Sequence, residues 1–233
     1  MHPQTAKQPR SSVASWAAAP YVLPFAVFMF FLAIERFNPL PPAWDFGIRI
    51  VAVGGVLAVL SRRQIDLKMS RPLWTAAVGI GVFVLWIAPD CLFPGYRNFW
   101  LFNNGLVGSA RTSLSEAARN DELLLALRLA RAVIIVPVVE ELFWRGFLMR
   151  WLISSQFEKI PPGTYTPVAF WVTAVLFASE HGPYWDVGLL AGIVYNWWMV
   201  RTRRLGDLIW AHAITNACLS AYVMIFHRWE YWL

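Results

Sequence analysis

The sequence predicts an all-α fold, a polytopic transmembrane helical bundle of about seven spans. Of the 233 residues, 58% are hydrophobic and only 15% are charged, whereas soluble domains carry about 25% charged residues. The chain therefore has too few charges to cover a water-facing surface, and the same numbers exclude disorder. Aromatic residues reach 16%, with 14 Trp, which is typical of rings that lie at both membrane interfaces.

The first three apolar segments are separated by short stretches that stop helices. Segment 16–34 follows a polar, basic start and has no small-x-small cleavage site, so we expect an uncleaved signal anchor. Segment 46–60 begins after the proline-rich run at 38–42, and segment 73–88 begins after Ser61-Arg62-Arg63. Prolines and polar residues at these places end one helix before the next begins.

Four more apolar segments follow a longer connection, 89–122, which carries an Asn-Asn-Gly turn signal and is a candidate for an interfacial helix. A straight crossing takes about 20 helical residues, and several of these segments are shorter. The breaks between these segments are Pro161-Pro162-Gly163, Gly182-Pro183 and the arginines at 201–204; the segments are 123–152, 167–181, 187–200 and 205–226.

The domain organisation predicted from this pattern is simple. Residues 1–15 form a polar N-terminal segment, and residues 16–233 form a single transmembrane domain. Within that domain, 123–226 is the part that carries the motifs described below. We find no internal repeat and no second domain.

The net charge of +6 is explained by orientation in a membrane, because the cations fall in short loops beside apolar segments. With seven spans these loops share one face, and the positive-inside rule makes that face, with the N-terminus, cytoplasmic. We therefore expect a multi-pass protein of a bacterial inner membrane, with membrane lipids and no nucleic acid as partners. The basic residues are Lys7, Arg10, Arg62, Arg63, Lys68, Arg71, Arg201, Arg203 and Arg204.

Two adjacent carboxylates in the fourth apolar segment are the first chemical signal. A central acidic residue costs about 2.5–3.5 kcal/mol on insertion scales, so an intramembrane carboxylate is a functional candidate. Glu141 and Arg145 lie at i, i+4 and can pair, whereas Glu140 points about 100° away around the helix. Glu140 is thus predicted to be a spare carboxylate. The alternative is an ion pair that merely stabilises a helix end.

Two later segments add imidazoles and an amide. His181 ends the fifth segment, and His212 and Asn216 share one face of the seventh. Such donors can form an oxyanion site or a structural interhelical hydrogen bond. The fifth segment is only about 22 Å long as a helix, so we expect Gly182-Pro183 to break the chain inside the membrane and bring His181 beside Glu140.

The three motifs together resemble one family. Glu-Glu-x-x-x-Arg at 140–145, Phe-x-x-x-His at 177–181 and His-x-x-x-Asn at 212–216 lie on separate apolar segments, joined by Leu189-Leu190-Ala191-Gly192 through Arg201-Thr202. This pattern, over residues 133–217, resembles the type II CAAX prenyl endopeptidases and the related CAAX protease and bacteriocin-processing family. More loosely, it is similar to the CAAX protease-related proteins that accompany bacterial exosortase systems.

The resemblance implies a glutamate-dependent intramembrane endopeptidase. Glu140 would be the general base, and His181 would help to hold and polarise the attacking water. His212 and Asn216 would stabilise the oxyanion, while Glu141 and Arg145 would shape the site around them. The resemblance also implies a peptide or lipidated protein as substrate, with CAAX-box processing as the family's activity and no cofactor.

Three other interpretations stay open at this point. Glu140, His181 and His212 form a possible two-His, one-carboxylate zinc set, although no His-Glu-x-x-His motif is present. Cys218 is a weaker candidate nucleophile, because it faces away from His212 and no cation adjoins it. The chain could also be a non-catalytic membrane scaffold or an accessory protein in protein sorting.

Overall fold

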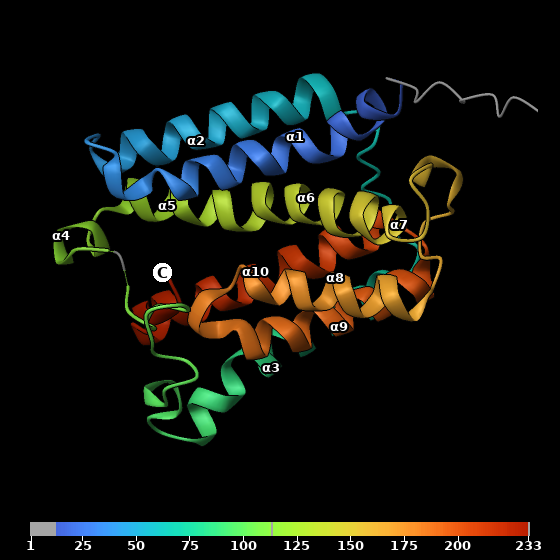
Figure 1. Cartoon of the computed structure of the whole chain (residues 1–233). Coiled ribbons are helices and arrows are strands. Elements are labelled where there is room, and N and C mark those ends of the chain that lie inside the picture. The colour runs from blue at the N-terminus through green and yellow to red at the C-terminus, as the bar shows by residue number, and fades with distance from the viewer. Residues whose placement is uncertain (1–12, 113, 233) are drawn as a thin grey trace, which may run out of the picture.

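The computed structural model describes residues 13–112 and 114–232, and Figure 1 shows them as a bundle of helices. The predicted polar segment 1–15 lies mostly outside the described residues, and so do Lys7 and Arg10. The predicted all-α fold is confirmed, since the described residues contain helices and turns and no β-strand. The helices are α1 Val13–Ala33, α2 Pro42–Val56, α3 Pro72–Leu92, α4 Glu116–Arg119, α5 Glu122–Ala130, α6 Val136–Glu141, α7 Met149–Trp151, α8 Pro167–Ser179, α9 Trp185–Thr202 and α10 Leu205–Phe226.

Each of the seven predicted apolar segments is helical, but the predicted count of seven spans is not confirmed. Four helical stretches are long and apolar enough to cross a membrane: Trp16–Ala33, Pro42–Ser61, Pro72–Leu92 and Leu205–Phe226. Helix α8 is apolar but shorter. The fourth segment is helical from 122 to 151, but two π-helical stretches interrupt its α-helix. Four of the seven segments are therefore candidate membrane spans by length and composition, and the other three are helices of the same bundle.

The helix 122–151 runs through the centre of the bundle. Asp121 caps its start by accepting a hydrogen bond from the Leu124 amide at 3.0 Å. Its π-helical stretches are Arg131–Ile135 and Leu142–Leu148, and α6 lies between them. In a π-helix the hydrogen bonds run from i to i+5, so side chains after it turn to a new face of the helix, and such stretches are frequent at functional sites. The α-helix that carries the two glutamates thus has a π-helical stretch on each side, and each stretch changes the direction in which the following side chains point.

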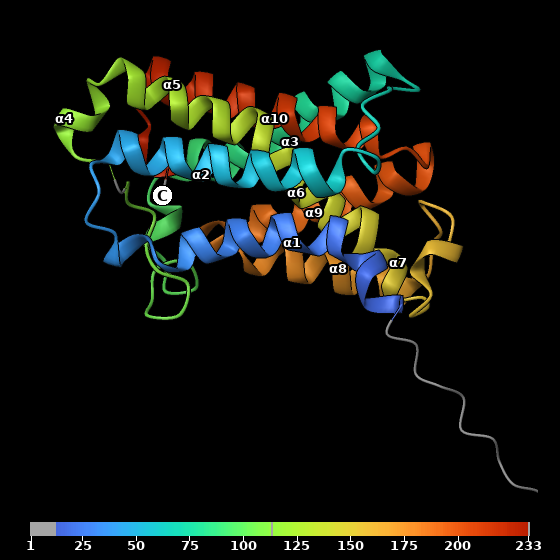
Figure 2. The ribbon, with the colours of Figure 1, turned by 90° about the horizontal axis from the view of Figure 1, so that it is seen from above.

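The other helices form two groups around this central helix. In Figure 1, α1 and α2 lie above it, and α3, α8, α9 and α10 lie below it. Figure 2 shows the same arrangement from above, with α1 and α2 side by side. Helix α3 packs closely on α10, and α8 packs closely on α9. The loops 62–71 and 201–204, which carry most of the predicted basic clusters, meet at one end of the bundle, where Arg204 lies 3.7 Å from Asp66.

Small residues let the lower helices approach one another. A Cβ on Gly79 of α3 would lie 2.5 Å from the Ala211 carbonyl oxygen of α10. Similarly, a Cβ on Gly192 of α9 would lie 3.1 Å from the Ala174 carbonyl oxygen of α8. Close backbone approach at small residues is a common mode of helix packing in membranes. These contacts pack α10 against α3 and α9 against α8, and both α10 and α8 also contact the central helix.

A buried carboxylate anchors the start of α10. Asp207 is fully buried and accepts hydrogen bonds from the Ser70 hydroxyl at 2.6 Å and the Thr75 hydroxyl at 2.7 Å. The amides of Ser70 and Arg71 also donate to it, at 3.0 and 3.2 Å. Asp207 therefore ties α10 to the loop before α3, which sets the position of the residues further along α10.

Candidate active site

The four predicted catalytic residues line a single cavity of about 110 Å³ between the helices. Glu140 comes from α6, His181 from the turn after α8, and His212 and Asn216 from α10. Three stretches of chain that are distant in the sequence thus meet at one small space. The remaining walls are Trp86, Val136, Phe177, Ala191, Tyr195, Thr215 and Leu219.

Glu141 and Arg145 form the ion pair that the i, i+4 spacing predicts. Their side chains are fully buried, and Nη1 of Arg145 lies 3.1 Å from Oε1 of Glu141. Arg145 also donates from Nε to Oδ1 of Asn196 at 2.9 Å, and its guanidinium lies 4.5 Å from the centre of the Phe177 ring. A buried ion needs this kind of partner set to offset its desolvation. The pair therefore links the central helix to α9 and leaves Glu140 free for the cavity.

Glu140 is a buried carboxylate without such a partner. Its side chain is only 6% exposed, and its Oε2 atom has no hydrogen-bond partner among the described residues. A buried polar atom normally has a partner, and an exception calls for an explanation such as a catalytic role or a bound water or ion. Oε2 of Glu141 is also without a partner among the described residues, but of the two glutamates Glu140 is the one that lines the cavity, and this makes it the candidate working group.

His181 is held in one orientation by its own helix end. Its Nδ1 atom lies 2.7 Å from the Phe177 carbonyl oxygen. A carbonyl can only accept, so Nδ1 carries the hydrogen and Nε2 of a neutral ring carries a lone pair. The chain breaks at the expected place, since α8 ends at Ser179 and a 3-10 turn, Gly182–Tyr184, follows with Gly182 at a φ of 52°. A Cβ on Gly188 would lie 3.1 Å from the His181 ring, so α9 confines that ring as well.

A tether from the long connection reaches this turn. Arg97 of the connection donates from Nη1 to the Pro183 carbonyl oxygen at 2.9 Å and pairs with Asp186 at the start of α9. Its Nε atom donates to Asp90 at 3.1 Å. Burial lowers the pKa of the Arg97 guanidinium, but the hydrogen bond and negative charge of Asp186 outweigh burial, and the pKa is raised above its ordinary value. The turn next to His181 is thereby joined to the end of α3.

His212 and Asn216 face the cavity, and each has a partner in the central helix. Nδ1 of His212 lies 2.9 Å from Oε1 of Glu141. Nδ2 of Asn216 donates to the Ala132 carbonyl oxygen at 2.8 Å, within the first π-helical stretch. An amide nitrogen has two hydrogens, so a single bond to Ala132 leaves the other hydrogen of Asn216 for a ligand. These contacts fix α10 against the central helix at the height of the two glutamates.

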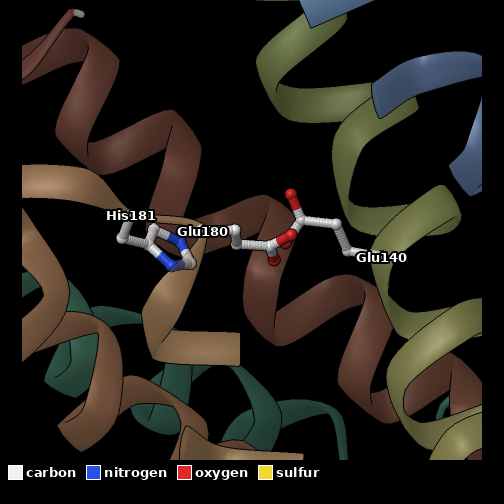
Figure 3. Close-up of side chains that lie close together, drawn as sticks. All are labelled: Glu140, Glu180 and His181. Atoms are coloured by element: carbon white, nitrogen blue, oxygen red, sulfur yellow. The ribbon is translucent and has the colours of Figure 1, made fainter. Parts of the chain in front are cut away.

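Glu180 is a further site residue that the sequence analysis quoted within a motif but assigned no role. Oε1 of Glu180 accepts a hydrogen bond from Nε1 of Trp144 at 2.9 Å. Ligating atoms of Glu140, Glu180 and His181 lie within 4.8 Å of one another, and Figure 3 shows the carboxylates of Glu140 and Glu180 facing each other. The sequence could have indicated Glu180 as a site residue, because it is an ionisable residue at the end of an apolar segment and directly precedes His181.

The same three residues are the group that could share a metal ion. Among the described histidines, cysteines and acidic residues, Glu140, Glu180 and His181 are the one group of three or more whose ligating atoms come this close. The zinc set considered from the sequence contained His212 in place of Glu180. In the structure Nδ1 of His212 faces Glu141, and Glu180 occupies the third corner beside Glu140.

One of the comparisons with known proteins agrees with the motifs. Residues 122–218 match the family described as type II CAAX prenyl endopeptidase Rce1-like. No curated protein and no solved structure matches the chain. The family predicted from the three motifs is therefore confirmed over residues 122–218, and this match together with the four apolar helices supports an integral membrane protein.

Proposed function

We propose that this chain is an intramembrane endopeptidase that hydrolyses a peptide bond of a membrane-associated protein, with Glu140 as the general base. The observation that carries the proposal is the buried cavity lined by Glu140, His181, His212 and Asn216. Catalysis by several groups requires them within hydrogen-bond reach of one substrate. The proposed substrate is the peptide of a lipidated or otherwise membrane-tethered protein, with membrane lipids around the bundle.

The first chemical step is the attack of water on the peptide carbonyl carbon. A water between Glu140 and Nε2 of His181 loses a proton to the Glu140 carboxylate as its oxygen bonds to that carbon. The carbonyl π bond breaks and its electron pair moves to the oxygen, which becomes the oxyanion of a tetrahedral intermediate. The unpaired Oε2 of Glu140 supports this role, because it is an acceptor with no competing donor among the described residues.

The oxyanion is placed near His212 and Asn216. A His212 ring that carries hydrogens on both nitrogens donates one to Glu141 and presents the other, on Nε2, to the cavity. The second amide hydrogen of Asn216 is the other proposed donor. A preorganised oxyanion donor contributes about 2.7–4 kcal/mol in known hydrolases. Arg145 has a supporting part, because it holds Glu141 in the position that orients His212.

The intermediate collapses when Glu140 returns the proton to the leaving nitrogen. The C–N bond breaks, its electron pair goes to the nitrogen, and the products are one new carboxyl terminus and one new amine. Glu140 is again a carboxylate. One residue thus serves as base and then as acid, as general acid–base catalysis allows.

The test compares protein termini in membranes that contain the wild-type chain or Glu140→Gln. Mass spectrometry of N- and C-terminal peptides is expected to show new termini with the wild type that are missing with Glu140→Gln. Glu158→Gln, at an exposed glutamate far from the cavity, is the matched control and should retain them. Identical termini in all three samples would contradict the proposal, and a cellular phenotype that survives Glu140→Gln would favour the scaffold interpretation.

A further inference from the structure

We propose that a pocket at one end of the bundle binds a phosphate group, supplied by the headgroup of an anionic phospholipid. The pocket has a volume of about 440 Å³ and shares no lining residue with the catalytic cavity, so it is a second site, separate from the proposed function. Small-molecule sites typically have volumes of about 300–1,000 Å³. We call it the arginine pocket, and its charged and amide-bearing side chains are Gln64, Asp66, Arg150, Arg203 and Arg204.

The arginine pocket lies where candidate membrane spans begin and end. Tyr21, near the start of the span in α1, is one of its walls, and Leu205, another wall, is the first residue of the span in α10. Gln64 follows shortly after the span that ends at Ser61. Figures 1 and 2 show α7 beside the start of α1 at this end of the bundle. Because the ends of a span lie at the headgroup region, a ligand in this pocket is at the depth of lipid phosphates.

The charge of the arginine pocket favours an anion, since its three arginines and one aspartate sum to +2. The Arg203 side chain takes part in no hydrogen bond or ion pair within the described residues. Arg204 lies 3.7 Å from Asp66, but their side chains are 49% and 53% exposed, and an exposed pair of this length contributes little to stability. Guanidinium groups bind phosphate oxygens through paired N–H donors. Arg203 and Arg204 are thus available to a phosphate in the pocket.

Arg150 is a buried donor whose position is fixed before any ligand binds. Its Nε donates to the Ile160 carbonyl oxygen at 2.8 Å, and its Nη1 donates to the Gly146 carbonyl oxygen at 2.9 Å. Its Nη2 donates to the Glu158 carbonyl oxygen at 3.3 Å, and its guanidinium lies 5.3 Å from the centre of the Phe157 ring. A guanidinium has five N–H groups, so two of them are without an acceptor among the described residues. Arg150 therefore brings a buried positive charge and spare donors to the pocket.

Gln64 adds a requirement for a hydrogen-bond donor on the ligand. Its Oε1 atom is buried and has no partner within the part of the chain that the structure describes. A buried acceptor of this kind calls for a bound water or ligand that donates to it. A phosphatidylglycerol headgroup has both a negative phosphate and hydroxyl donors, whereas phosphatidylcholine has no net charge and no hydrogen-bond donor in its headgroup. The arginine pocket is therefore expected to select phosphatidylglycerol.

The loops around the arginine pocket are pressed against the helices. A Cβ on Gly163, whose φ is 72°, would lie 2.4 Å from the Met199 carbonyl oxygen of α9. A Cβ on Gly206 of α10 would lie 2.5 Å from the Lys68 carbonyl oxygen. Glycine at both positions allows the loops to approach the helices this closely. The walls are thus in place without the ligand, which reduces the cost of ordering them on binding.

The test measures binding of phosphatidylglycerol and phosphatidylcholine to the purified, detergent-solubilised full chain by native mass spectrometry. The test variant is Arg203→Gln/Arg204→Gln. The matched control is Arg62→Gln/Arg63→Gln, which removes the same charge from exposed residues that do not line the pocket. Phosphatidylglycerol should bind the wild type and the control equally, and the test variant at least about tenfold more weakly. Circular dichroism and thermal unfolding verify that each variant is folded.

Competition identifies the source of the phosphate. Phosphatidylglycerol that excess inorganic phosphate fails to displace supports the lipid as the ligand, whereas displacement supports a phosphate site that also takes soluble phosphate. Equal binding of phosphatidylglycerol and phosphatidylcholine would overturn the proposal, because the headgroup charge would then not be recognised. An equal loss of binding in both double variants would also overturn it, because the whole basic surface would then attract the lipid. Either result would leave the proposed function untouched, which fails instead if no cleavage depends on Glu140.

Discussion

His212 of α10 contacts Glu141 of α6, with Nδ1 and Oε1 2.9 Å apart, although 71 positions separate them in the sequence. The same Glu141 oxygen lies 3.1 Å from Nη1 of Arg145. Glu141 therefore has two partners, one that offsets its charge and one that it orients. The adjacent Glu140 takes part in neither contact. In the proposed site Glu141 therefore has a structural role and Glu140 is the general base.

Replacement of Glu141 by Gln should reduce both stability and activity. It leaves Arg145 buried without its counter-ion, and removal of one partner of a buried ion pair typically lowers the free energy of unfolding by about 3–5 kcal/mol. It also loosens the His212 ring. Thermal unfolding in detergent should show a clear fall in Tm, while Glu158→Gln stays at the wild-type value. An unchanged Tm would mean that the buried pair does not stabilise the bundle.

Gly188→Ala should impair activity with little loss of fold. The new Cβ would lie 3.1 Å from the His181 ring, so the ring must shift by a few tenths of an ångström from its position in the cavity. Gly81→Ala is the matched control, because its Cβ has no heavy atom of the described structure within 4 Å and alanine favours a helix by about 1 kcal/mol. We expect cleavage to fall at least about tenfold in Gly188→Ala alone. Equal rates in both variants would argue against a precise position for His181.

Asn216→Ala tests the proposed oxyanion donor. Loss of one such donor lowers kcat by about 10²–10³-fold in known hydrolases, whereas loss of a structural interhelical bond costs only about 0.6 kcal/mol of stability. The predicted signature is a large fall in kcat with a small change in Tm. Cys218→Ala on the same helix should retain full activity, and its loss of activity would revive the thiol mechanism.

Arg97→Gln should loosen the turn that carries His181. The substitution removes the ion pairs with Asp90 and Asp186 and the hydrogen bond to Pro183. Tm and cleavage rate should both fall, and Arg97→Lys should restore only part of them, because an ammonium lacks the planar fork of the guanidinium. The pKa of Arg97 is raised in the folded protein. The stability that its ion pairs contribute is therefore fully present at every pH below the ordinary pKa of arginine, and it is lost only when the pH rises through the raised pKa. Arg97 should therefore stay charged between pH 6 and about pH 9, and the fall in Tm caused by Arg97→Gln should be the same across this range.

Helix positions and local pairs were predictable from the sequence. The fourth apolar segment, 123–152, was predicted as one helix and is helical from 122 to 151. The Glu141–Arg145 pair follows from i, i+4 spacing alone and is present at 3.1 Å. These features depend on the helical period and on apolar patterning, which a single sequence contains.

The contacts between segments were not predictable in the same way. The partners of His212 and Asn216 are Glu141 and the Ala132 carbonyl, and nothing in local spacing specifies them. The π-helical stretches on both sides of α6 shift the helical phase, which a regular 3.6-residue period does not anticipate. The predicted count of about seven spans is not confirmed, since four helices are long and apolar enough to cross a membrane, and apolar composition does not distinguish a crossing helix from one packed inside a bundle.

The most direct test of the account is the kcat/KM of the purified chain and of Glu140→Gln for a peptide that contains a terminus found in wild-type membranes. Because general base catalysis contributes about 10²–10⁴-fold, Glu140→Gln should lose at least about 10²-fold in kcat/KM while its Tm stays near that of the wild type. Glu158→Gln should match the wild type. A folded Glu140→Gln chain that cleaves the peptide at the wild-type rate would contradict the claim that this buried carboxylate performs the reaction.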